Sequence, residues 1–179
     1  MNMELEAMAI AMPPCTGHPN RLPFEGVLTL VDTASDKPPS GARGHRVLLK
    51  SDAVDRALPS LLGMALDYAP GLDRHDARRK VGIITSADLE DLNTGARKLS
   101  VTGYLFAQDF PELVREMSGP AKELGMSYEI TGVRVADLRA PVWTITDFIF
   151  TGAAVLRRDK AAYRDTWIEI PRTIEALNH

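Results

Sequence analysis

Apolar and polar residues alternate over short stretches along most of this chain, which is the pattern of half-buried β-strands. Turn-forming residues separate the stretches, and the regular exchange of strands with helices that marks a parallel sheet is missing. The predicted strands are Phe24 to Asp32, His45 to Leu49, Val81 to Thr85, Lys98 to Phe106, Met126 to Arg134, Val142 to Phe150 and, as a seventh, Ala153 to Arg157. The turn Asn93-Thr94-Gly95 joins the third and fourth as a hairpin.

Apolar residues three and four positions apart predict a smaller number of helices. These are Ser51 to Tyr68, Asp109 to Met117 and a short piece from Lys160 to Thr166. We expect Ser51 to cap the first helix and Pro59 to kink or split it. Asp109 and Glu112 are spaced as a capping box for the second helix. Many short strands with few helices favour an antiparallel barrel or sandwich with helices packed outside it, a mainly β fold of the α+β kind.

Length and composition indicate one globular domain. The chain has 179 residues, 45% of them hydrophobic and 25% charged, which is enough to bury a core without disulfides. Residues 1–22 are expected to be a flexible N-terminal arm, residues 23–166 the domain and residues 167–179 a C-terminal tail. The single cysteine, Cys15, lies in the arm and fits a reducing compartment.

Charge and hydropathy exclude several classes of partner. A net charge of -3 gives no general attraction to nucleic acid or to anionic membranes. No run approaches the ~20 apolar residues of a membrane span, and Glu4 and Glu6 stand where an export signal is basic. The four histidines and one cysteine show no metal-ligand spacing. We therefore expect a soluble intracellular protein without a metal or another cofactor.

Two residues 52 positions apart carry the candidate chemistry. His75 lies in a charged loop before a predicted strand, and Ser127 lies at the start of another strand, after Gly125. A histidine can accept a proton near neutral pH, and a serine that loses its proton can attack a carbonyl. The alternatives are a solvated surface histidine and a serine bonded to nearby backbone. If the fold brings the two residues together, the chain is a serine hydrolase.

A third residue would orient the imidazole. Asp147 is the first candidate, because a carboxylate inside an apolar strand needs a partner such as His75. Glu129 is the alternative, two residues from Ser127 and so on the same strand face, and His45 is a further option. The pair Arg157-Arg158 either helps to hold an oxyanion or is simply solvated.

The order of these segments over residues 24–163 resembles the phage prohead (capsid maturation) serine proteases. The matching segments are Glu25-Gly26-Val27-Leu28, His75 with Val81-Gly82, Gly95 through Tyr104, Gly125 to Ile130, the acid Asp147 and the closing Ala161-Ala162-Tyr163. The family commonly has Glu where this chain has Asp147, so a shorter acid would have to reach His75 there.

The resemblance implies a closed antiparallel barrel like that of the herpesvirus assemblins, ringed by helices. It implies a Ser-His-Asp triad of Ser127, His75 and Asp147, and an oxyanion site at Arg157-Arg158. It further implies cleavage of the major capsid protein and of scaffold polypeptide, and self-cleavage, inside the assembling prohead in the bacterial cytoplasm. Assemblin-like folds often form dimers. The alternative is a capsid assembly or scaffolding protein that keeps the fold without catalysis.

Overall fold

The described residues form one curled sheet with two helices against it. The computed structural model describes residues 10–11, 17–119 and 123–171, so Cys15 lies outside the described residues. The strands are β1 (Ile10–Ala11), β2 (Leu22–Val31), β3 (Arg46–Leu49), β4 (Ala65–Asp67), β5 (Lys80–Asp91), β6 (Arg97–Leu105), β7 (Leu124–Val135), β8 (Val142–Arg157) and β9 (Trp167–Glu169). The helices are α1 (Ser51–Leu61) and α2 (Pro111–Ser118), with one 3₁₀ turn, η1 (Arg158–Lys160).

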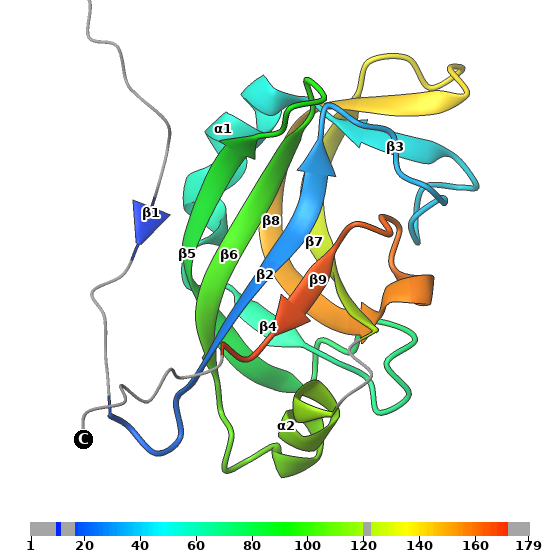
Figure 1. Cartoon of the computed structure of the whole chain (residues 1–179). Helices are drawn as coiled ribbons and strands as arrows, with labels where there is room; N and C mark the ends of the chain where they lie inside the picture. Colours follow the sequence, from blue (N-terminus) through cyan, green and yellow to red (C-terminus); the bar gives the residue numbers. More distant parts are fainter. Residues whose placement is uncertain (1–9, 12–16, 120–122, 172–179) are drawn as a thin grey trace, which may run out of the picture.

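The sheet is an open half-barrel. Its strand order is β3-β8-β4-β5-β6-β2-β9, with β1 paired to β5 and β7 paired to β8. The fold is mainly β, as predicted, but the expectation of a closed barrel is wrong (Figure 1). Side chains rather than a hydrogen-bonded ladder bridge β2 and β7: a Cβ at Gly26 of β2 would lie 2.8 Å from Sδ of Met126 on β7.

Strand β8 pairs with three other strands. It pairs antiparallel with β7 along most of its length, parallel with β3 at its beginning, and parallel with β4 near its end. The chain therefore runs without a break where two separate strands were predicted. Both parallel pairs depart from the predicted all-antiparallel arrangement.

The first helix is shorter than its sequence pattern predicted. Helix α1 ends at Leu61, and Gly63 takes a positive φ of 78°, a conformation that glycine adopts without strain. The chain then turns back, and β4 pairs with both β5 and β8. The apolar residues predicted for the last turns of the helix instead supply a short buried strand. Pro59 lies inside α1 without ending it.

Neither helix is capped as predicted. At the start of α1, the carboxylate of Asp32 accepts the backbone N–H of Ser51 at 2.9 Å and also binds the Ser51 hydroxyl. At α2, Asp109 accepts a hydrogen bond from Asn20 at 2.8 Å, and Glu112 accepts one from the Tyr68 hydroxyl at 2.5 Å. Both members of the predicted capping box are therefore used in tertiary contacts.

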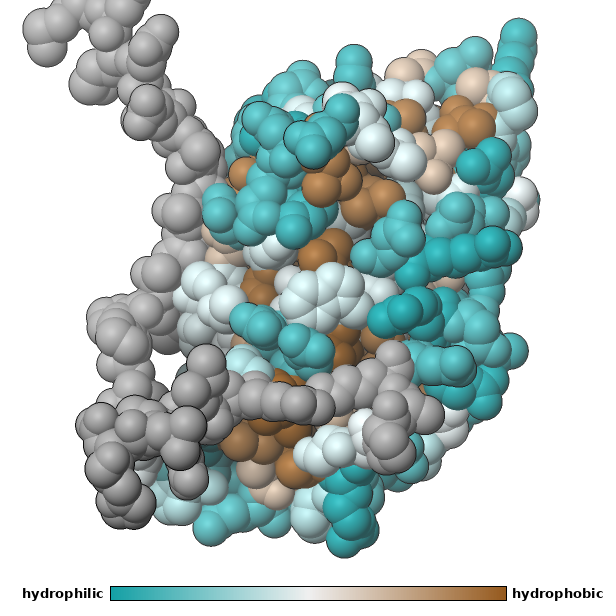
Figure 2. Space-filling model, in the orientation of Figure 1, coloured by the Kyte–Doolittle hydropathy of each residue, from teal (hydrophilic) through white to brown (hydrophobic). Residues whose placement is uncertain are grey.

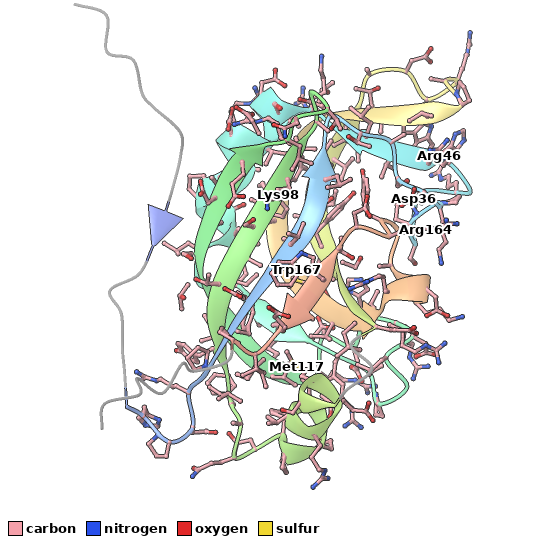
Figure 3. All side chains as sticks on the ribbon, in the orientation of Figure 1. Asp36, Arg46, Lys98, Met117, Arg164 and Trp167 are labelled. Atoms are coloured by element: carbon pink, nitrogen blue, oxygen red, sulfur yellow. The ribbon has the colours of Figure 1, made fainter. Side chains whose placement is uncertain are left out.

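Residues 158–171 are folded back against the sheet. The helix predicted from Lys160 to Thr166 is not formed, since only its first residue belongs to η1 and the rest is bends, turns and irregular chain. Strand β9, which lies in the predicted tail, pairs with β2. Asp36 and Arg164 lie side by side (Figure 3), and the Asp36 carboxylate accepts the Arg164 backbone N–H at 2.7 Å. On the face that carries β2, β6 and β9, polar residues surround patches of apolar ones (Figure 2).

Candidate functional site

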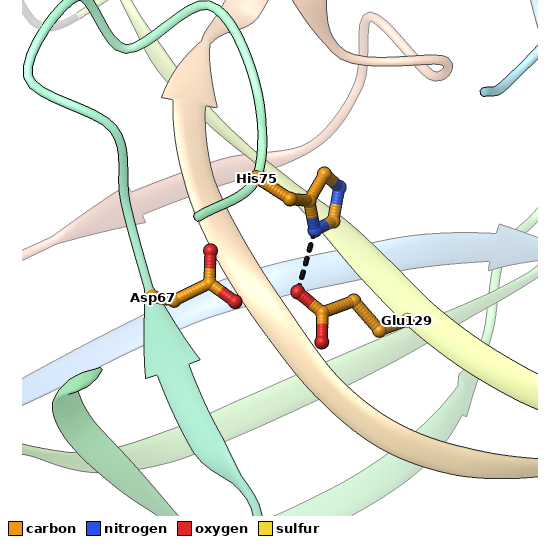
Figure 4. Close-up of side chains that lie close together, drawn as sticks. All are labelled: Asp67, His75 and Glu129. Atoms are coloured by element: carbon orange, nitrogen blue, oxygen red, sulfur yellow. Dashed lines mark hydrogen bonds and ion pairs between the residues drawn. The ribbon is translucent and has the colours of Figure 1, made fainter. Parts of the chain in front are cut away.

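His75 is held in place by the loop that joins β4 to β5. The last residue of β4, Asp67, accepts the backbone N–H of Asp76 on its Oδ1 at 3.0 Å. The Asp76 carboxylate in turn lies 3.4 Å from Nε of Arg78 and 3.5 Å from Nε of Arg79. These contacts tie the loop to the end of β4 and turn His75 toward β7 (Figure 4).

The imidazole of His75 is paired with Glu129. Nδ1 of His75 lies 2.7 Å from Oε1 of Glu129, and the two side chains are 30% and 25% exposed (Figure 4). Glu129 therefore occupies the place beside the histidine that was assigned first to Asp147. A carboxylate oxygen can only accept, so Nδ1 carries the hydrogen and Nε2 is left to take a proton.

A second carboxyl group, that of Asp67, completes this cluster. Asp67 is only 2% exposed, and one carboxyl oxygen each of Asp67 and Glu129 and one ring nitrogen of His75 all lie within 4.8 Å of one another. Asp67 was not predicted as a site residue, because the helix predicted from Ser51 to Tyr68 included it. The only signal was a charge within the otherwise apolar segment from Met64 to Ala69.

Proximity drives the pKa values of the two carboxyl groups apart. The hydrogen bond from His75 lowers the pKa of Glu129 to about 2, against the effect of its partial burial. Burial, followed by the hydrogen bond to Glu129, raises the pKa of Asp67 to about 7. Below that pH, Glu129 is therefore the ionised partner of His75 and Asp67 is the protonated one.

Ser127 lies beside this cluster. It is two residues before Glu129 on β7, so both side chains are on the same face of the strand. Ser127 and His75 both line one open hollow of about 580 Å³. The other residues of its wall are Pro39, Ser40, Asp73, Arg74, Tyr128, Glu129, Leu156, Lys160 and Ala162. The fold thus brings His75 and Ser127 to one accessible surface.

Small residues on β8 make this arrangement sterically feasible. Ser127 of β7 and Asp67 of β4 both pair with Ala154, from opposite sides of β8. Glu129 pairs with Gly152, where a Cβ would lie 2.7 Å from Oε2 of Glu129. The two outer strands β4 and β7 can therefore bring their candidate side chains together across β8, because β8 contributes almost no side-chain volume there.

Asp147 is not part of the cluster, so the prediction that it is the partner of His75 is wrong. It pairs with Arg134 on β7, with 3.9 Å between Oδ2 and Nε of the arginine, and its side chain is 52% exposed. Along β8 it lies five residues from Gly152, which corresponds to about 17 Å of extended strand. Ile145 and Phe148 beside it are buried while Asp147 faces solvent, so no buried partner is needed.

Of the remaining candidates, His45 lies elsewhere, and the backbone N–H groups of Arg157 and Arg158 are already bonded. His45 stacks on Trp143, with 4.4 Å between ring centroids. The backbone N–H of Arg157 donates to the carbonyl of Leu72, and that of Arg158 donates to the carbonyl of Glu123. Those two backbone donors are therefore occupied. Lys160, in the same turn, lines the hollow with Ser127.

The cluster could also hold a metal ion. Asp67, His75 and Glu129 each offer one ligand atom, and a His with two carboxylates is a donor set that divalent transition metals accept. A metal there would replace the hydrogen bond between His75 and Glu129. The same three residues therefore support either an oriented imidazole or a metal centre.

Comparison of the chain with protein-family models, with curated proteins and with solved structures found no match. Neither helix in the described part of the chain has the length and hydrophobicity needed to cross a membrane.

Proposed function

We propose that this protein is a serine endopeptidase in which Ser127 is the nucleophile, His75 the general base and Glu129 the residue that orients the imidazole. One observation carries the proposal: the 2.7 Å contact between Nδ1 of His75 and Oε1 of Glu129, made at the hollow that Ser127 also lines. Serine hydrolases use a base and an orienting acid in contact of this kind, and the nucleophile candidate Ser127 lies on the same strand face as Glu129.

The reaction follows from the protonation states. Glu129 accepts the Nδ1 hydrogen, so Nε2 of His75 takes the proton from Ser127 Oγ as that oxygen attacks the scissile carbonyl. The imidazolium that forms is stabilised by the Glu129 carboxylate and then donates its proton to the leaving amine. Water attacks the acyl-enzyme by the same route and releases Ser127.

The tetrahedral oxyanion needs a donor that is not already bonded. Because the backbone N–H groups of Arg157 and Arg158 donate to carbonyls, the turn at the end of β8 contributes through a side chain. Lys160 of that turn and Arg74 of the β4–β5 loop both line the hollow. We assign charge stabilisation to these two cations.

The substrate class comes from the resemblance of residues 24–163 to prohead serine proteases. It supports cleavage of the major capsid protein and scaffold polypeptide during assembly of a phage prohead. An open hollow suits an extended polypeptide rather than a small enclosed ligand. The alternative function is that of a capsid assembly or scaffolding protein with no catalytic activity.

The test combines active-site labelling with cleavage. The purified wild type, Ser127→Ala and Ser40→Ala would be treated with a fluorophosphonate and mapped by peptide mass spectrometry. Each would also be co-expressed with the capsid and scaffold polypeptides encoded beside it. Ser40 lines the same hollow and is the matched control. We expect labelling at residue 127 and new substrate termini in wild type and Ser40→Ala, and a loss of at least ~10³-fold in Ser127→Ala.

Two results would overturn the proposal. Intact substrates with all three chains, while particles still assemble, would favour the assembly protein. Cleavage that survives Ser127→Ala but stops with a chelator and returns with Zn²⁺ would favour a metal-dependent hydrolase, which the Asp67–His75–Glu129 donor set makes the second candidate.

A further inference from the structure

A second pocket, which the proposed mechanism does not use, adjoins the hollow at Ser127. It has a volume of about 320 Å³, and we call it the apolar pocket. Its wall includes Val47, Ile130, Val133, Leu138, Trp143 and Ile145. We propose that the apolar pocket is a substrate subsite, which takes a large apolar side chain of the polypeptide one to three residues from the bond that Ser127 attacks. This inference rests on the proposed serine peptidase activity and adds the side-chain class of its substrate.

The two cavities have part of their walls in common. Pro39 and Tyr128 line both the hollow and the apolar pocket. Tyr128 lies between Ser127 and Glu129 on β7, and successive side chains of a strand point to opposite faces. Ser127 and Glu129 therefore belong to one face of β7, and Tyr128 and Ile130 belong to the other. Strand β7 is thus the wall that separates the nucleophile candidate from the apolar pocket.

An extended polypeptide can reach both faces of β7 at once. Among the described residues, β7 forms a hydrogen-bonded ladder with β8 alone, and its residues 131–134 are exposed. A chain that lies along the other edge of β7 presents its side chains alternately to the two faces. Ser127 is one residue from Tyr128 and three residues from Ile130, which corresponds to about 3 to 10 Å of extended chain. The side chain that enters the apolar pocket therefore lies one to three residues from the scissile bond.

The residues of the apolar pocket decide the chemistry of its occupant. Three large apolar side chains are well exposed in the described part of the chain, and two of them, Val133 at 41% and Leu138 at 63%, line this pocket. Exposed apolar side chains that gather at one place mark a binding surface. The charged residue on the wall is Arg43, which disfavours a lysine or arginine side chain. The volume is at the small end of the ~300–1,000 Å³ typical of ligand pockets, which suits one large side chain.

The walls of the apolar pocket are fixed before anything binds. The backbone N–H of Ala42 donates to the Pro39 carbonyl at 3.2 Å, and that of His45 donates to the Ala42 carbonyl at 2.8 Å. The ring of Trp143 stacks on His45 with 4.4 Å between ring centroids, and its Nε1–H donates to the Leu138 carbonyl at 3.2 Å. A preformed wall lowers the entropic cost of binding. The pocket is therefore suited to select among side chains.

The first experiment identifies the preferred side chains from cleaved bonds. A proteome-derived peptide library would be digested with full-length wild type, Leu138→Asp, Val133→Asp and Ile149→Asp, and the new termini mapped by mass spectrometry. Ile149 is 53% exposed and lines neither cavity, so Ile149→Asp is the matched control for a carboxylate in place of an exposed apolar residue. Circular dichroism would verify that each variant is folded.

Wild type and Ile149→Asp should share a preference for Phe, Tyr, Trp, Leu or Met at one position within three residues of the cleaved bond. Leu138→Asp should cleave these peptides at least ~10-fold more slowly, because an apolar occupant would desolvate the new carboxylate. The inference is overturned if wild type has no such preference, or if both Leu138→Asp and Val133→Asp retain it unchanged.

A second measurement does not depend on turnover. The chain has two tryptophans, Trp143 at the apolar pocket and Trp167 on β9, so the indole N–H region of an NMR spectrum holds a probe and an internal control. N-acetyl-phenylalanine amide should shift the Trp143 signal in the millimolar range and leave Trp167 in place, whereas N-acetyl-lysine amide should shift neither.

No shift of Trp143, or the same shift with both amides, would overturn the inference. If wild type neither cleaves nor labels at Ser127, the proposed function fails, while this titration still decides whether the apolar pocket takes an apolar side chain.

Discussion

The carboxylate of Glu129 occupies the space that a side chain at Gly152 would fill. The two residues pair directly across β7 and β8, and a Cβ at 152 would lie 2.7 Å from Oε2 of Glu129. Glycine at this position usually weakens a strand, because it packs nothing and loses more backbone entropy on folding. Here it allows an acidic side chain to lie flat over the sheet and reach His75.

Gly152→Ala should therefore separate Glu129 from His75 while leaving the strand intact. We expect fluorophosphonate labelling of Ser127 to slow by roughly tenfold or more, because the displaced carboxylate no longer orients the imidazole. Gly119→Ala is the matched control, since a Cβ there meets its nearest atoms at 3.5 and 3.8 Å, which is ordinary contact. Equal labelling rates for both variants would show that Glu129 has room to move aside without consequence.

The two acidic candidates for the third member of the triad are separable by amide substitution. Glu129→Gln keeps the shape but reverses the preferred tautomer of His75, and in serine proteases a change of this kind costs roughly 10⁴-fold in kcat. Asp147→Asn alters only an exposed contact with Arg134, so activity should stay within about twofold. Steady-state cleavage rates at pH 7 measure both, and the reverse ranking would restore Asp147 as the partner of His75.

The carboxyl pair predicts how stability changes with pH. The folded pKa of Glu129 lies near 2, below its ordinary 4.5, so its contribution is present above pH 4.5 and is lost as pH falls toward 2. The folded pKa of Asp67 lies near 7, above its ordinary 3.8, so the folded state holds an extra proton between these values. Stability contributed by Asp67 is full below pH 3.8 and declines as pH rises to 7.

The combined contribution of the two groups to the stability of the folded protein is largest near pH 4 to 5. We expect thermal melts to show wild type losing stability between about pH 4 and 7 relative to Asp67→Asn, which has no proton to lose at this position. Parallel Tm curves for the two chains over that range would mean that Asp67 titrates alike in the folded and unfolded states.

A different prediction concerns the start of α1. Asp32 has a positive φ of 58° and its carboxylate receives the Ser51 N–H, so Asp32→Ala removes a cap and places alanine in an unfavourable backbone region. The expected cost is roughly 2 kcal/mol, a fall of several degrees in Tm. Asp32→Asn keeps an acceptor and tolerates this φ, so it should lose much less. If Asp32→Ala had the same Tm as wild type, a water molecule would have to satisfy the Ser51 backbone N–H in place of Asp32.

The fold was predictable where local pattern and tertiary pairing agree. Alternation identified β2, β3, β6 and β7 closely, and the Asn93-Thr94-Gly95 turn joins β5 to β6 as predicted. The prediction failed for β4, because its apolar residues continue the helical spacing of α1 and only the turn at Gly63 ends that helix. The local sequence pattern could not predict whether the barrel closes, since closure depends on whether the two edge strands of the sheet pair with each other.

For the site, the sequence identified His75, Ser127 and the alternative Glu129, which the fold gathers at one hollow. It ranked Asp147 first because a charge in an apolar strand suggested burial, whereas in the structure that residue faces solvent. Asp67 was missed for the opposite reason: its burial depends on a strand that the pattern did not reveal. Periodicity predicts on which face of its own helix or strand a residue lies. It does not predict which other part of the protein packs against that face.

The order of the strands determines when during synthesis the group of Asp67, His75 and Glu129 can form. Asp67 and Ser127 both pair with Ala154, and Glu129 lies against Gly152, so within the sheet β4 and β7 are held side by side by β8. A ribosome must therefore translate beyond residue 157 and release that strand before His75 and Ser127 can be held together. On the proposed peptidase function, the order of the strands would therefore keep an unfinished chain from cleaving its neighbours.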